Sequence, residues 1–187
     1  MKPLARTHPD EALMERLRGG DAGAFGELIG RHLGAVAGFA YRMVGNAAEA
    51  DDIAQETLLR LWRHRAVWEP RAQLRTWLFR VARNLCVDRF RRREVVTDEF
   101  PELADERRSA SGEVQQRQVE RIVASALAAL PERQRAAIGL VYYEGLSNIE
   151  AADVLGVSVE AIESLLARAR RNLRESLRDL HPHLGEE

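Results

Sequence analysis

Apolar residues recur every three or four positions along most of this chain, the spacing that gives a helix one buried face. The first long stripe runs from Phe25 to Met43, and Asp21 before it is a suitable helix N-cap. The same pattern predicts a second helix from about residue 48 to 64 and a third from residue 74 to about 93. The first half of the chain is therefore expected to be helical, with a short loop at residues 67–73 before the third helix.

A change in composition separates this half from the rest. Residues 96–112 are rich in acids, contain Pro101 and keep no apolar period, so they are expected to form a linker. A helical pattern resumes near Val114, and Pro131 suits the first position of a further helix that stops at Gly145. We predict an all-α protein with two small helical domains, residues 10–95 and 114–180, joined by an acidic flexible linker over residues 96–113.

The segment from residue 147 to 171 has the plan of a helix-turn-helix. Ser147 and Glu150 have the spacing of a capping box that starts a short helix, and Gly156 allows a tight turn after it. Ala151 is small enough for the two helices to cross closely. In this motif the second helix enters the major groove of DNA. The alternative is an ordinary helical hairpin.

The outward positions of that second helix are the candidate DNA-reading face. Its arginines can reach phosphates, whereas Glu160 and Glu163 repel them unless they accept from a cytosine amino group or simply favour the helix N-terminus. The candidates for this face are Ser158, Glu160, Ser164, Arg168, Arg170 and Arg171.

The composition of the 187 residues excludes several classes of protein. Cys86 is the only cysteine, so no disulfide within the chain and no cysteine-based zinc site can form. The five histidines have no ligand spacing, and neither a metal nor a cofactor is expected. No apolar run approaches a signal peptide or the roughly 20 residues of a membrane span. We expect a cytoplasmic protein without catalytic residues.

Charge is segregated along the chain although the formal net charge is only −1. Residues 60–93 hold eleven arginines and two acids, whereas residues 94–113 hold seven acids and two arginines. The basic helix at 74–93 lies beside a loop, residues 67–73, that contains Trp68. Arginines bind phosphates and aromatic rings stack on unpaired bases, so this region suits melted DNA. The alternatives are solvated arginine faces and a Trp68 that belongs to the core.

Several motifs resemble those of bacterial RNA polymerase sigma factors, in the order that this family has them. Residues 50–62 (ADDIAQETLLRLW) resemble the polymerase-binding segment, and residues 76–84 (TWLFRVARN) with 88–92 (DRFRR) resemble the promoter-melting helix. Residues 130–135 (LPERQR) with 145–147 (GLS) are similar to the start of the C-terminal domain. The likeness is greatest to the extracytoplasmic-function (ECF) group.

This resemblance implies a set of roles. The polymerase-binding residues would contact the clamp helices of the largest subunit, and the C-terminal domain would contact the flap. The protein would be a monomer when free and would have an anti-sigma factor as a further partner. The implied polymerase-binding set is Asp51, Asp52, Gln55, Glu56 and Leu59, and the set for the minus-ten element of promoter DNA is Trp68, Arg71, Arg75, Arg80, Arg83, Asn84, Asp88 and Arg91.

The reading face for the minus-thirty-five element departs from the family. Glu163 and Leu165 stand where the family often has lysine and arginine. Two other functions therefore remain open at the level of sequence. One is a stand-alone helix-turn-helix regulator, which leaves the basic helix 74–93 unexplained. The other is a sigma mimic that only sequesters an anti-sigma protein, which does not need that basic face.

Overall fold

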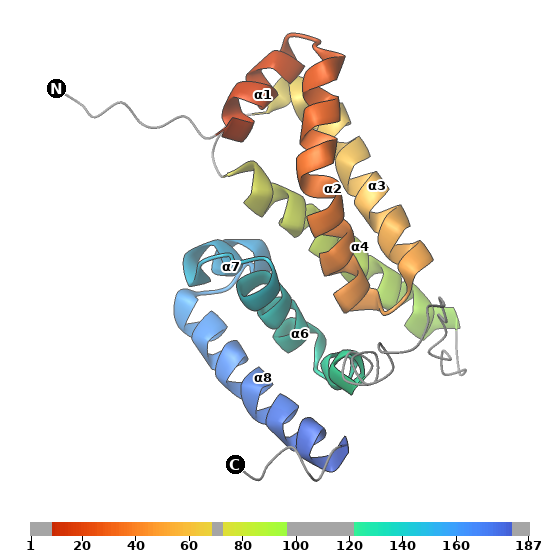
Figure 1. The fold of residues 1–187 in the computed structure, drawn as a ribbon, viewed down its shortest axis with the longest axis vertical. Helices are drawn as coiled ribbons and strands as arrows, with labels where there is room; N and C mark the ends of the chain where they lie inside the picture. Colours follow the sequence, from red (N-terminus) through yellow and green to blue (C-terminus); the bar gives the residue numbers. More distant parts are fainter. Residues whose placement is uncertain (1–8, 69–72, 97–121, 181–187) are drawn as a thin grey trace, which may run out of the picture.

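The computed structural model describes residues 9–68, 73–96 and 122–180, and every regular element within these ranges is a helix (Figure 1). No helix in this described part is both long enough and apolar enough to cross a membrane. The first half contains α1 (Pro9–Arg18), α2 (Ala22–Val44), α3 (Ala47–His64), the short 3-10 turn η1 (Arg65–Val67) and α4 (Leu74–Val96). The second contains a helical segment at residues 122–128, α6 (Glu132–Ile138), the π-helical turn η2 (Gly139–Tyr143), α7 (Asn148–Leu155) and α8 (Val159–Leu180).

Capping groups fix the ends of α2 and α3 close to where the sequence predicts them. The Asp21 carboxylate accepts from the backbone N–H groups of the first turn of α2, at 2.8 and 3.2 Å. Gly45 ends α2 with a φ of 73°, a conformation that favours glycine. The Asn46 side chain then accepts from the Glu49 N–H at 3.0 Å and starts α3. The predicted all-helical first half is confirmed.

Helix α2 is the centre of the first half, because it packs against α1, α3 and α4. The buried apolar stripe of α2 includes Leu28 and Phe39, which meet Leu61 of α3 and Leu78 of α4 in one core. Helix α1 adds Leu13, Met14 and Leu17, all buried, although the apolar pattern of the sequence did not single out this element.

The helix after Pro131 differs from its prediction at both ends. Pro131 is the N-cap, with an extended ψ of 142°, rather than the first helical residue. The predicted single helix to Gly145 instead widens into η2, where the Glu144 N–H donates to the Gly139 carbonyl at 3.0 Å, five residues back. Gly145 then ends the turn with a φ of 66°.

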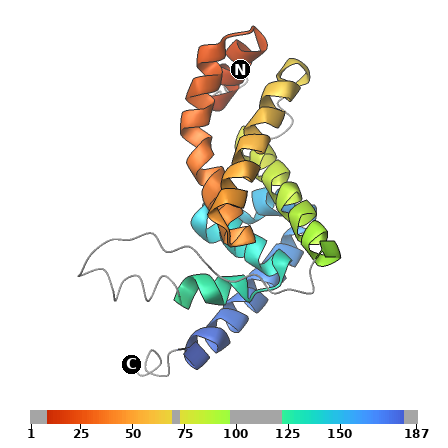
Figure 2. The ribbon, with the colours of Figure 1, turned by 90° about the vertical axis from the view of Figure 1, so that its right-hand side faces the viewer.

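The two halves lie against each other, with α4 beside α7 and the end of α2 beside α6 and η2 (Figure 2). One continuous cluster of buried apolar residues crosses this boundary. Phe39 of α2 packs edge-on against Phe79 of α4, with ring centroids 5.4 Å apart. A Cβ atom on Gly139 would lie 3.3 Å from the Phe39 ring, so the absence of a side chain there permits the close approach.

Two parts of the predicted organisation lie outside the described residues. These are most of the expected linker, from residue 97 onward, and the beginning of the second domain up to residue 121. The loop at residues 67–73 is described only at its two ends.

A histidine–carboxylate pair joins α1 to α2. His32 and Asp10 are both buried, and the His32 Nε2 lies 2.9 Å from an Asp10 oxygen, while Arg31 donates to the other oxygen at 3.1 Å. Burial lowers the pKa of His32, against the opposing influence of Asp10, and the nearby Arg75 and Arg31 lower it further.

This lowered pKa predicts a loss of stability in mild acid. The unfolded chain takes up a proton on His32 near its ordinary pKa of about 6.5, before the folded chain does, so the free energy of unfolding falls as the pH drops below that value. The His32→Gln variant lacks this contribution. In urea unfolding at pH 7.5 and pH 5.5, the advantage of the native protein over His32→Gln should shrink at the lower pH. A constant or growing advantage would contradict the assignment.

Candidate functional site

The five residues of α3 that the sequence predicts to bind polymerase lie on one side of the helix. The opposite side is buried against α2 and α4, and there the Thr57 hydroxyl donates to the Ile53 carbonyl at 2.7 Å. Four of the five are exposed and one is half-buried; Leu59, at 45% exposure, is the only large apolar side chain among them. This α3 outer face consists of Asp51, Asp52, Gln55, Glu56 and Leu59.

A groove of about 310 Å³ separates this face from α4. Its acids pair with arginines: Arg60 with Glu56 at 2.9 Å, and Arg89 of α4 with Asp52 at 3.6 Å. Exposed pairs of this kind contribute little to stability, so the acids can exchange partners at small cost. The groove is lined by Asp52, Ile53, Glu56, Arg60, Leu85, Asp88, Arg89 and Arg92.

The predicted minus-ten residues of α4 separate into two groups. Asn84, Asp88 and Arg91 are exposed to solvent. The three arginines nearer the start of the helix are only partly exposed and turn toward the C-terminal half. The structure therefore does not present them as one open basic face.

Each of these three arginines contacts an acidic residue of the other half. Arg83 is the least exposed, with 17% of its side-chain surface accessible. These acidic partners could not be predicted from the sequence, since nothing in their local spacing distinguishes them from solvated acids. The pairs are Arg83 with Glu132, 3.2 Å apart; Arg80 with the Asp153 carboxylate and, at 2.9 Å, its carbonyl; and Arg75 with the Glu144 carbonyl and, at 3.8 Å, its carboxylate.

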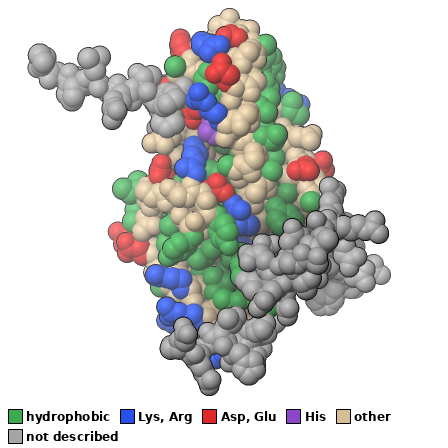
Figure 3. Space-filling model, viewed as in Figure 1, with side chains coloured by type: hydrophobic (Ala, Val, Ile, Leu, Met, Phe, Trp, Pro, Cys, Tyr) green, Lys and Arg blue, Asp and Glu red, His purple; other side chains and the backbone are tan. Residues whose placement is uncertain are grey.

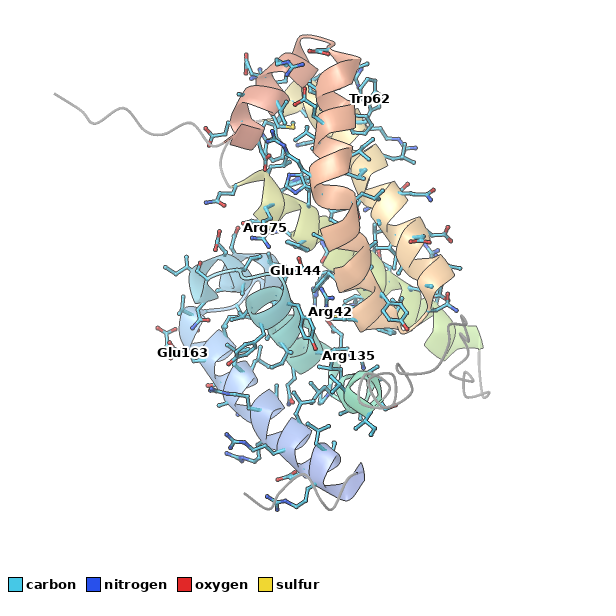
Figure 4. All side chains as sticks on the ribbon, viewed as in Figure 1. Arg42, Trp62, Arg75, Arg135, Glu144 and Glu163 are labelled. Carbon is cyan, nitrogen blue, oxygen red and sulfur yellow. The ribbon has the colours of Figure 1, made fainter. Side chains whose placement is uncertain are left out.

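Glu144 is the most deeply placed of these acids. It lies between Arg42 of α2 and Arg75 of α4, and Figure 4 shows the three side chains converging between the halves. Only 7% of its side-chain surface is accessible. Burial raises the pKa of Glu144, and the two arginines offset that rise only in part. Arg42 also lies over the Tyr143 ring, 4.5 Å from its centroid.

Trp68 is buried rather than available for stacking on a base, with 6% of its surface accessible. The Trp68 ring packs edge-on against Trp77, with ring centroids 5.7 Å apart. His64 stacks on Trp77, also with a centroid distance of 5.7 Å. This cluster joins the end of α3 to the start of α4. Arg71, the other loop candidate, lies outside the described residues.

The helix-turn-helix has the geometry that its sequence predicts. The Ser147 hydroxyl accepts from the Glu150 N–H at 3.3 Å, and the Glu150 carboxylate accepts from the Ser147 N–H at 2.8 Å, which completes the capping box. These bonds lower the pKa of Glu150. Gly156 turns the chain with a φ of 64°, and Ala151 is fully buried between the helices.

The second helix of the motif, α8, presents its predicted reading face to solvent. Ile162, Leu166 and Ala169 point inward and are buried. Basic side chains follow α8 on the surface in Figure 3, and Glu163 points away from the N-terminal half in Figure 4. The six predicted contacts Ser158, Glu160, Ser164, Arg168, Arg170 and Arg171 are all exposed.

These observations define a helical protein that carries a helix-turn-helix and a separate acidic face. Residues 28–95 match the family description "Sigma-70 region 2", and residues 120–173 match "Sigma-70, region 4". The chain is 36% identical over 156 residues to the ECF RNA polymerase sigma factor SigL of Mycobacterium tuberculosis, covering 82% of this chain and 88% of SigL. It is 29% identical over 188 residues to SigW of Bacillus subtilis, covering 89% and 96% of the two chains.

Solved structures agree with these sequence matches. CnrH, in a complex with the cytosolic domain of CnrY, matches with a TM-score of 0.71 and 32% identity over 92% of this chain and 98% of CnrH. RpoE of Bartonella quintana, in a complex with the anti-sigma factor NepR, matches with a TM-score of 0.69 and 28% identity over 82% and 96%. The chain belongs to the ECF group of RNA polymerase sigma factors.

The capping box predicts a measurable contribution to the C-terminal half. Ser147→Ala leaves the Glu150 N–H without its acceptor and should lower the free energy of unfolding by about 1 kcal/mol. Ser164→Ala, an exposed change in the second turn of α8, is the matched control and should not lower the free energy of unfolding. Chemical denaturation followed by circular dichroism compares them. Equal stability of the two variants would contradict the role of the cap.

Proposed function

We propose that this protein binds core RNA polymerase through the α3 outer face and directs initiation at specific promoters. The proposal rests on one observation. Leu59 is exposed among acidic residues on α3, while the opposite side of this helix is buried in the core. An apolar contact ringed by charge is typical of a protein interface with defined orientation. The largest-subunit clamp helices are the proposed partner of this face, and the flap is the proposed partner of the C-terminal half.

The two DNA elements are assigned to different helices. We assign minus-ten recognition and melting to α4 with the loop before it, and minus-thirty-five recognition to α8. Exposed arginines along α8 can bind phosphates while residues in its first turns meet base edges. Residues 10–95 and 114–180 are thus proposed to act as two functional domains, with residues 96–113 as the linker that lets them separate on the polymerase.

We also propose how the protein is regulated and where in the cell it acts. Two solved relatives are complexes with a partner protein, CnrH with the cytosolic domain of CnrY and RpoE with the anti-sigma factor NepR, and the second supports an anti-sigma partner for this chain. We propose that the protein is held by such a partner as a monomer in the cytoplasm until a stress or envelope signal releases it. It performs no reaction of its own in this account, and it needs no cofactor.

In vitro transcription with purified core polymerase over a promoter library tests this function. The native chain should direct initiation from a defined subset of promoters. Asp52→Ala/Glu56→Ala should lower its affinity for core polymerase by about tenfold or more, equivalent to about 1.4 kcal/mol. Both residues lie on the proposed contact face, and neither has a buried partner whose loss would unfold the chain.

The matched control is Glu15→Ala/Glu27→Ala, which removes two exposed acids from α1 and α2 and makes the same change in net charge. It should bind polymerase as the native chain does. If the native chain supports no initiation from any promoter, the proposed function is wrong. A chain that binds duplex DNA tightly without polymerase would instead be a stand-alone helix-turn-helix regulator.

A further inference from the structure

The first two turns of α8 carry no positive charge. Residues 159–166 contain two acids, Glu160 and Glu163, and neither arginine nor lysine, whereas the five arginines of this helix all lie between residues 168 and 178. The later part of α8 therefore suits phosphates, while the part that would meet base edges is acidic. An acid held against DNA is repelled by the phosphates on both sides of the groove, so each of these two acids needs a physical explanation.

Glu160 is explained by the start of the helix. The Ser158 hydroxyl accepts from the Ala161 N–H at 3.2 Å and caps α8. The Glu160 carboxylate accepts from its own backbone N–H and from the Ser158 hydroxyl, and these bonds lower the pKa of Glu160. A negative charge in the first turn is also favoured by the helix dipole. Glu160 thus stabilises the N-terminus of the helix in the absence of DNA.

Glu163 has neither of these local roles. It lies in the second turn of α8, and the helix dipole acts mainly on the first turn. No basic residue lies three or four positions from Glu163 in the sequence, so the usual ion pair along a helix surface cannot form. Glu160, three positions before it, is a like charge and disfavours the helix. The stability of α8 therefore does not explain why an acid stands at this position.

The structure presents Glu163 to a partner outside the chain. Its side chain is exposed and points away from the N-terminal half in Figure 4. Its neighbours Ser164 and Ala167 are also exposed, and both are small enough to leave the carboxylate projecting from the helix surface. Ile162 and Leu166 are buried in the core and fix the rotation of α8 about its axis. Glu163 is therefore a projecting acceptor on the face of α8 assigned to base edges.

A carboxylate distinguishes bases by the groups that they place opposite it in the major groove. Cytosine offers an amino donor there without an adjacent acceptor. Guanine offers two acceptors, thymine offers an acceptor and a methyl group, and adenine has its N7 acceptor beside its amino group. Because a carboxylate is repelled by each of these acceptors, it selects cytosine by rejecting the other bases as well as by forming one hydrogen bond.

We propose that Glu163 is a specificity-determining residue and selects a cytosine at one position of the minus-thirty-five element. This inference rests on the proposed function for the assignment of α8 to that element. The Glu163 carboxylate accepts from the N4 amino group of the cytosine, and the arginines from Arg168 onward bind the phosphates. Leu165 is partly buried against the core, so Glu163 and Ser164 are the residues of the second turn that can reach bases.

A promoter library with a randomised minus-thirty-five element tests this assignment, with the full chain bound to core polymerase. Each template carries a transcribed barcode, so sequencing of the transcripts gives the base preference at every position. The native chain should prefer C over each other base by about tenfold at one position of one strand. Glu163→Gln should shift the preference at that position to A, and Glu163→Arg should shift it to G, because these side chains bond to the two purines bidentately.

Glu175→Gln is the matched control. It removes the same charge from another exposed position of α8, about 18 Å further along the helix, and should keep the native preference at every position. Thermal unfolding followed by circular dichroism checks that the variants are folded as the native chain is. A general weakening of DNA binding would lower initiation at all templates and would not change the preferred base at one position.

The possible failures distinguish this inference from the proposed function. An unchanged base preference in Glu163→Gln, or a native preference without a selected C, would overturn the role of Glu163 and leave the sigma function in place. Loss of initiation by both Glu163 variants with unchanged preference among the residual transcripts would also overturn it. If the native chain directs no initiation from any template, the proposed function is wrong and the inference fails with it.

Discussion

The burial of Phe39 between the two halves constrains how the rest of the protein can be arranged. Its ring lies edge-on to Phe79 of α4 and directly above Gly139 of η2, so three elements far apart in the chain share one contact. Complete burial of a side chain of this size contributes about 1.5–3 kcal/mol. Once α2 and α4 are packed on it, α6 and η2 lie against the end of α2, and α7 lies beside α4. The arginines of α4 then meet acids in place of solvent.

The packing of the two halves bears on function because it engages the guanidinium groups of three α4 arginines. Arg75, Arg80 and Arg83 cannot satisfy carboxylates and phosphates at the same time. We propose that the halves separate when the chain initiates transcription, which would expose apolar surface around Phe39. Contacts with polymerase have to compensate for that exposure.

Much of the fold could be predicted from the sequence because it depends on local signals. The side chains of Asp21 and Ser147 cap helices by accepting from backbone N–H groups no more than three residues away. Gly156 lies in a turn with a positive φ that few other residues adopt. The outward row on α3 followed from helical periodicity together with family likeness. These features need no knowledge of distant contacts.

Other features depended on contacts between distant residues and could not be predicted. An arginine such as Arg83 has the same local pattern whether it binds a phosphate or Glu132, 49 residues away. Trp68 adjoins a loop that suits DNA, yet it is buried because Trp77 and His64 surround it. The close approach of the Phe39 ring to Gly139 joins residues 100 positions apart, which periodicity cannot show.

In the proposed function the two halves of the chain separate on core polymerase, and a distance measurement tests this separation most directly. Dyes on Tyr41→Cys in α2 and Ile149→Cys in α7, two exposed positions within five residues of the Arg42–Glu144 contact, would report the separation of the halves by energy transfer, with the buried Cys86 left in place. We predict high transfer efficiency in the free protein and low efficiency in a transcriptionally active complex with core polymerase. The same high efficiency in both states would contradict the account.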